Sequence, residues 1–177
     1  MVLVEDEAKV QRESSLKSIW FEKGQQPTIR VDQKKEGQSF YGALDIKSGK
    51  CHLWDLSGRQ NSANTVKFLR QLEDYYQGKD VLLIWDGAPS HRGEVKTYLK
   101  SLHQQRRTYH KRRWKLQLMY FPPYWPKLNP QERVWKLGKQ AATHNSEDTF
   151  EDKLYKFRQY ITQHTFKTNF LNKYASS

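Results

Sequence analysis

Three carboxylates stand at points where the chain changes from one predicted element to another. Asp6 follows the first apolar run of the sequence, and Asp86 comes directly after a second one at residues 81–85. Glu132 lies in the first turn of a predicted helix that follows a proline-rich loop. If these elements meet at one edge of a sheet, the three side chains lie close together. Clustered carboxylates repel one another unless cations neutralise them, so this pattern indicates a cation site.

The chemistry that fits such a site is cleavage of a phosphodiester. Mg²⁺ is typically held by one or two carboxylates plus substrate phosphate. Two such ions about 4 Å apart can activate a water and stabilise the leaving oxygen. Each residue alone also has a simpler explanation, since Asp86 stands in a turn and Glu132 complements a helix dipole. The paired carboxylates of a retaining glycosidase are another alternative, but that chemistry does not explain the positive charge of the chain.

The composition narrows the classes of protein and partner. The 177 residues suit one ordinary domain, and we predict a single domain over residues 1–177. Lys and Arg number 31 against 19 Asp and Glu, a net charge of +12. This charge favours a polyanionic partner, with nucleic acid ahead of an anionic membrane surface or a merely solvated basic surface. No apolar stretch is long enough for a transmembrane helix, and the N-terminus lacks a signal-peptide pattern. The single cysteine, Cys51, cannot form an internal disulfide and fits a reducing cytosol.

Basic side chains concentrate in residues 103–115, which we predict to form a loop. Tyr109 and Trp114 are interleaved with them, a pattern typical of nucleic-acid binding because aromatic rings stack on bases. We predict that this stretch contacts DNA phosphates, although a solvated loop is the simpler alternative. The proposed DNA-binding residues are Arg106, Arg107, Lys111, Arg112, Arg113 and Lys115.

The elements that must position the carboxylates alternate between strands and helices. A continuous apolar run such as residues 81–85 suits a central strand covered on both faces, and Val66, Leu69 and Leu72 recur at helical spacing. The order predicts an α/β fold with a central mixed sheet of five strands, flanked by helices. The predicted strands are residues 2–4, 39–46, 51–56, 81–85 and 116–121, and the predicted helices begin at Asn61 or Ser62, at Ser90 or His91, at Asn129 and near residue 147.

At the carboxylates the chain resembles a known family, the DDE transposases. The resemblance is to their bacterial insertion sequence 630 branch, which is related to the mariner-like transposases. It covers nearly the whole chain and rests mainly on three segments: Val-Glu-Asp-Glu at 4–7, Leu-Ile-Trp-Asp-Gly-Ala-Pro-Ser-His at 83–91, and Phe-Pro-Pro-Tyr-Trp-Pro-Lys-Leu-Asn-Pro-Gln-Glu-Arg-Val-Trp at 121–135. The third segment is the most specific.

The resemblance implies an RNase H-like fold and metal-dependent cleavage and transfer of DNA strands. It implies Asp6, Asp86 and Glu132 as catalytic residues and as ligands of two Mg²⁺ or Mn²⁺ ions. The implied partners are transposon ends and target DNA, with a homodimer in the synaptic complex, no membrane, and a location in the bacterial cytoplasm with the nucleoid. Glu7 has a supporting place beside Asp6, and Trp135 matches a position that we interpret as packing.

Two further positions carry simpler roles in the same family pattern. Asn129 matches a position that we interpret as a helix cap. His91 either contacts phosphate or caps a helix, and capping is the simpler explanation.

The chain also departs from the family pattern. The spacer between Asp86 and Glu132 is longer than usual, and we interpret the basic stretch 103–115 as the insertion. Trp125 replaces a small residue in the proline-rich loop. The helix-turn-helix region expected at the N-terminus of a whole transposase is missing, so we expect the catalytic half alone. A catalytically inactive or domesticated DNA-binding remnant is the alternative hypothesis.

Overall fold

The computed structural model describes residues 1–12, 36–88, 92–109, 115–122, 129–142 and 149–169, with the backbone alone over 105–109. The elements follow the predicted order, and the predicted fold class is confirmed. They are β1 (Val2–Gln11), β2 (Gly37–Asp45), β3 (Cys51–Leu56), α1 (Ser62–Tyr75), β4 (Asp80–Trp85), α2 (Glu94–Tyr109), β5 (Lys115–Tyr120), α3 (Gln131–Ala141) and α4 (Phe150–Gln163).

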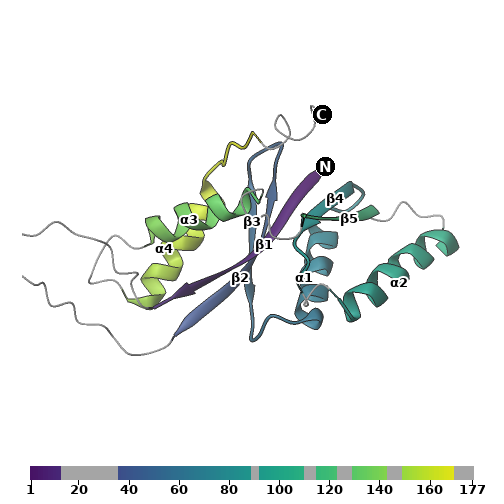
Figure 1. Ribbon diagram of the computed structural model, residues 1–177, viewed down its shortest axis with the longest axis horizontal. Helices are drawn as coiled ribbons and strands as arrows, with labels where there is room; N and C mark the ends of the chain where they lie inside the picture. The colour runs from purple at the N-terminus through teal and green to yellow at the C-terminus, as the bar shows by residue number, and fades with distance from the viewer. Residues whose placement is uncertain (13–35, 89–91, 110–114, 123–128, 143–148, 170–177) are drawn as a thin grey trace, which may run out of the picture.

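The five strands form one mixed sheet in the order β3-β2-β1-β4-β5 (Figure 1). The β1–β2 and β2–β3 pairs are antiparallel, whereas β4 runs parallel to both β1 and β5. A parallel pair requires a crossover connection, and α1 and α2 supply the crossovers around β4. The central position of β4 agrees with its continuous apolar sequence.

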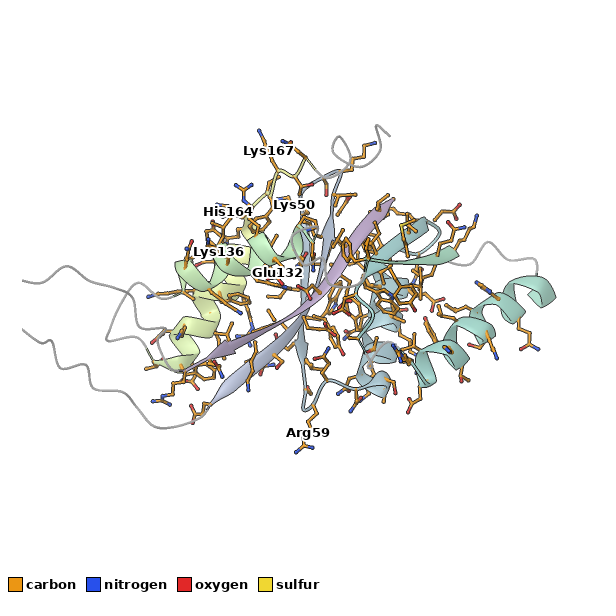
Figure 2. The ribbon with its side chains drawn as sticks, viewed as in Figure 1. Lys50, Arg59, Glu132, Lys136, His164 and Lys167 are labelled. Atoms are coloured by element: carbon orange, nitrogen blue, oxygen red, sulfur yellow. The ribbon has the colours of Figure 1, made fainter. Side chains whose placement is uncertain are left out.

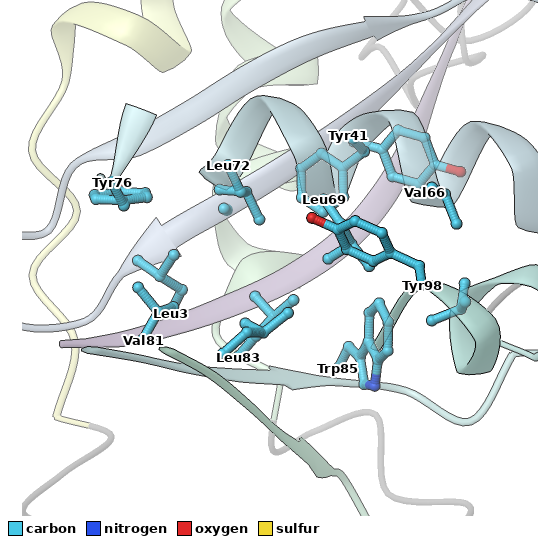
Figure 3. Packing of buried hydrophobic residues seen from close by; sticks show 14 of the residues in the cluster. Leu3, Tyr41, Val66, Leu69, Leu72, Tyr76, Val81, Leu83, Trp85 and Tyr98 are labelled. Carbon is cyan, nitrogen blue, oxygen red and sulfur yellow. The ribbon is translucent and has the colours of Figure 1, made fainter. Parts of the chain in front are cut away.

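Side chains of each strand alternate between two faces of the sheet, and a helix pair covers each face. Leu3, Tyr41 and Leu83 pack with the buried stripe of α1 on one face, which we call the α1 face (Figure 3). Ala8 and Phe40 belong to the cluster that includes residues of α3 and α4 on the opposite face, the α3 face. This alternation decides which carboxylates of β1 can meet α3.

The ends of α1 and α4 carry the capping signals that their sequences contain. The Asn61 side chain accepts a hydrogen bond from the Asn64 backbone N–H at 2.9 Å, as expected for an N-cap. Thr149 and Asp152 form a capping box at the start of α4. Apolar residues recur at helical spacing along this last helix and are buried: Phe150, Leu154, Phe157 and Ile161.

The structure corrects two predicted boundaries. β1 extends to Gln11 because its backbone keeps pairing with β2, so Asp6 lies inside a strand and not at its end. The three consecutive acidic residues do not end the strand, because their backbone groups pair as well as any others. α2 extends to Tyr109, so residues 103–109 are helical and not a loop. Gln, Arg and Lys are good helix formers, and a basic sequence is no sign of a loop.

None of the helices in the described ranges is both long and apolar enough to cross a membrane. The predicted helix start at Ser90 or His91 falls outside the described residues, and α2 itself begins at Glu94.

Candidate active site

Asp6 lies on the α3 face of β1. Its antiparallel neighbour on β2 is Gly42. The indole Nε1–H of Trp135, on α3, donates a hydrogen bond to Asp6 Oδ2 at 3.2 Å. A helix that packs on this face therefore contacts the Asp6 carboxylate directly.

The parallel pairing of β1 and β4 brings Asp86 level with Asp6 along the sheet. Val2 pairs with Leu82 and Val4 with Ile84, and the same offset continued two residues further matches Asp6 with Asp86. The pairing itself stops at Val4, where β1 continues with β2 alone. Asp86 is exposed just after the end of β4, and the Ala88 backbone N–H donates to its Oδ1 at 2.8 Å. The turn role of Asp86 and its proposed site role are thus compatible.

Glu132 reaches the site from the first turn of α3 (Figure 2). Pro130 is the N-cap residue of α3, and the Asn129 side chain just before it accepts a hydrogen bond from the Gln131 backbone N–H at 3.0 Å, so Asn129 still binds the start of the helix. Gln131 is fully buried and its amide Nε2 donates to Cys51 Sγ at 3.2 Å. Because Gln131 anchors the start of the helix on the sheet, the exposed side chain of Glu132 is held at the rim of the site.

The electrostatics of Asp6 reflect its burial and the negative charges around it. The pKa of Asp6 is raised to about 7, mainly by burial and to a smaller extent by the negative charges of Glu7, Glu132 and Asp86, although a backbone hydrogen bond at Glu7 lowers it. A carboxylate surrounded in this way favours a proton or a cation. The local charge around Asp6 is therefore negative.

The structure does not bring every predicted residue into this cluster. Glu7 lies on the α1 face, where it accepts a hydrogen bond from Gln60. Within the described residues, no group of three or more His, Cys, Asp and Glu side chains is arranged around a single ion position. Three carboxylates without a cation repel one another, which opposes closer approach. Shared coordination by Asp6, Asp86 and Glu132 stays a prediction.

The predicted DNA-binding stretch lies elsewhere as far as the structure describes it. Lys115 begins β5 and pairs with Asp80, at the opposite end of β4 from Asp86. Arg106 and Arg107 belong to the last turns of α2, and their side chains lie outside the description, as do Lys111, Arg112, Arg113 and His91. Contact of this stretch with DNA stays a prediction.

Sequence reasoning missed two residues that shape the site. Trp135 was predicted to pack, and it also donates a hydrogen bond to Asp6. Gly42 interrupts a strand-forming sequence in the middle of β2, and a glycine at such a position commonly marks close approach of another segment. That signal was present in the sequence, but it did not say which segment approaches.

Solved structures with the same arrangement define the class of fold. The Mos1 transposase paired-end complex with left transposon end has a TM-score of 0.66 and 18% identity, over 92% of this chain and 48% of that chain. The Mos1 mariner paired end complex with Mn gives 0.65 and 18%, with the same two coverages. The catalytic core domain of BIV integrase gives 0.51 and 13%, over 90% and 80%. The sheet and its two helix layers are thus an RNase H-like domain.

The sequence itself identifies the family. The model of the DDE superfamily endonuclease family matches residues 1–154, a range that includes all three carboxylates. This chain therefore belongs to the DDE superfamily endonucleases. No curated protein is similar enough to match it. The chain spans about half the length of the Mos1 chains to which it is similar.

Proposed function

We propose that this chain is the catalytic domain of a DNA transposase, which cleaves DNA and transfers DNA strands with divalent cations. The observation that carries the proposal is the convergence on Asp6: the parallel register of β1 and β4 sets Asp86 level with it, and α3, which carries Glu132, contacts it through Trp135. The family supports endonuclease chemistry, and the similar Mos1 structure in complex with a transposon end supports DNA as the partner. An inactive remnant is not favoured, because all three acids of the family pattern are present.

The donor set fits hard divalent cations. Carboxylate oxygens are the ligands that Mg²⁺ and Mn²⁺ prefer, and the negative charges of Glu132 and Asp86 act on the Asp6 carboxylate, so a cation there would be stabilised. We propose that Asp6 and Asp86 hold a pair of these ions and that Glu132 completes the site. Bound ions would supply an activated water and stabilise the leaving oxygen. The chain itself orients the ligands, for example through the Ala88 N–H that donates to Asp86.

A nicking assay on supercoiled plasmid DNA tests this function. We expect nicked circles with Mn²⁺ or Mg²⁺ and none with EDTA. Ca²⁺ serves as a control, because it binds carboxylates in a more flexible geometry. Salt-dependent DNA binding without nicking under any of these conditions would favour the inactive remnant instead.

Metal binding should depend on pH in a predictable direction. Since the pKa of Asp6 is about 7 in the metal-free protein, a proton competes with the ion below that pH. We expect the Kd for Mn²⁺ to rise about tenfold from pH 8 to pH 6, with about fivefold of that rise between pH 7 and pH 6, and to level off above pH 8. Titration calorimetry in matched buffers measures this. A Kd that stays constant between pH 6 and pH 8 would contradict the assignment of Asp6 as a ligand.

The exposed side of α3 carries basic residues along which a DNA backbone could run from the proposed site. Lys136 lies one helical turn beyond Glu132 (Figure 2). Arg133 and Lys139 are exposed on the same helix. These cations would hold phosphates next to the carboxylates. Placement of DNA along α3 belongs to the proposal.

We expect Lys136→Gln to weaken DNA binding about threefold and to lower the salt dependence by about one counterion. The matched control is Lys67→Gln, an exposed lysine of α1 on the other face of the sheet. Fluorescence anisotropy over a series of salt concentrations gives both quantities. Equal salt slopes for Lys136→Gln and the unsubstituted protein would place the DNA elsewhere.

The remaining assignments follow from this proposed activity. We propose a single catalytic domain that works as a homodimer in a synaptic complex with transposon ends and target DNA. DNA as substrate also suggests the bacterial cytoplasm, with the nucleoid, as the location.

A further inference from the structure

The contact between Trp135 and Asp6 joins two elements that are far apart in the sequence. Trp135 is 3% exposed and stacks on Phe157 of α4, with ring centroids 6.1 Å apart. Its indole N–H reaches Asp6 Oδ2 at 3.2 Å. Because packing fixes the ring, the donor has a fixed direction. A hydrogen bond to a charged carboxylate is stronger than one between neutral groups.

A notch in the sheet allows this contact. Gly42 pairs with Asp6 across β1 and β2 and has no side chain. A Cβ atom at this position would lie 2.5 Å from Trp135 Cζ2 and 2.5 Å from Gln131 Nε2, and closer still to Trp135 Cη2. The φ angle of Gly42 is not positive. The need for a glycine at this position therefore comes from the lack of space for a side chain and not from the backbone conformation. The edge of the indole therefore occupies the space that any other residue would fill.

The two anchored residues of α3 flank the proposed catalytic glutamate. Gln131 immediately precedes Glu132, and Trp135 follows it by three residues on the same short helix. Gln131 and Trp135 are four residues apart, so both face the sheet on one side of the helix. The depth to which they enter the notch sets the distance between α3 and β1. That distance in turn sets the separation of Glu132 from Asp6.

We infer that Trp135, seated in the notch at Gly42, is a positioning residue that orients the Asp6 carboxylate for metal binding. The inference rests on the proposed function, because Trp135 can position a metal ligand only if Asp6 binds the metal ion. Hydrogen-bond partners of this kind fix the orientation of a ligand before the ion arrives. Their removal typically weakens metal binding by about 10- to 100-fold.

Titration calorimetry with Mn²⁺ tests the inference in the protein without DNA. Trp135→Phe keeps an aromatic ring but removes the N–H donor, and we expect its Kd for Mn²⁺ to be about tenfold higher. Trp54→Phe is the matched control, since Trp54 lies on the α1 face and we expect no change there. In plasmid nicking, Trp135→Phe should need about tenfold more Mn²⁺ for the half-maximal rate and recover most of the rate at saturation. A purely structural role would lower the rate at every Mn²⁺ concentration.

Nuclear magnetic resonance of ¹⁵N-tryptophan-labelled, metal-free protein tests the hydrogen bond itself. The indole signal that vanishes in Trp135→Phe belongs to Trp135. In Asp6→Ala, which removes the acceptor, we expect this signal to move upfield while that of Trp54 stays in place. An unchanged Trp135 signal would overturn the inference.

The outcomes separate the inference from the proposed function. If the unsubstituted protein binds Mn²⁺ and Trp135→Phe binds it within twofold of the same Kd, the inference is wrong and the proposed function stands. If the unsubstituted protein binds no Mn²⁺, the proposed metal site is wrong, and the positioning role falls with it.

Discussion

Replacement of Asp86 by asparagine is expected to reduce metal-dependent DNA nicking by about 10³-fold or more. Asparagine keeps the size of the side chain and an oxygen that can accept the Ala88 N–H, but it removes the negative charge. Asp86 is exposed beyond the end of β4, so we expect the melting temperature to change by less than about 2 °C. The loss of rate would therefore report on the site and not on folding.

Asp80→Asn is the matched control for this prediction. Asp80 is an exposed aspartate at the first position of β4, the same strand that leads to Asp86 at its other end. The same chemical change at Asp80 should leave nicking within about twofold of the unsubstituted rate. If Asp86→Asn nicks DNA as fast as Asp80→Asn, the catalytic assignment of Asp86 is wrong.

Replacement of Gly42 by alanine is expected to destabilise the domain by about 3 kcal/mol, which lowers the melting temperature by roughly 10 °C. The added methyl group overlaps with Trp135 and Gln131, both almost fully buried. Neither side chain can move aside without leaving the core of the α3 face. Thermal or urea denaturation followed by circular dichroism measures the loss.

Gly37→Ala separates this steric effect from the general effect of a glycine in a strand. Gly37 begins the same strand, is exposed, and a Cβ there would meet the Cε atom of the flexible Lys9 side chain at 2.5 Å. We expect a change of at most about 0.5 kcal/mol, because the lysine can swing away and alanine reduces the entropy of the unfolded chain.

A double substitution then locates the clash. Trp135→Phe shortens the ring and should restore part of the stability that Gly42→Ala loses, an interaction free energy of about 1 kcal/mol. Strictly additive losses in the double variant would contradict the notch at Gly42.

The architecture of the domain could be predicted from local patterns. Four apolar residues of α4, Phe150, Leu154, Phe157 and Ile161, recur at helical spacing and are buried. The continuous apolar run of β4 lies in the interior of the sheet. Asn61 and Thr149 are capping residues whose hydrogen bonds are made within three positions along the chain. Such features depend on near neighbours, so a sequence contains the information that they need.

The wrongly predicted end of β1 depends on pairing with a remote segment, whereas that of α2 does not. β1 continues past its acidic residues because β2 offers backbone partners as far as Gly37. No local signal in residues 5–11 reports that a partner strand will be available. For α2, the basic residues were interpreted as a loop although their helix propensities are favourable.

The sequence by itself determined the family and the order of the elements, and it proposed the three carboxylates as site residues. Tertiary structure alone decided that Asp6 and α3 share one face of the sheet and that Trp135 contacts Asp6 through the space left by Gly42. The reason is physical: side-chain types and periodicity act over a few residues, whereas the face and depth at which a helix packs depend on strand register and on the shapes of side chains from distant segments.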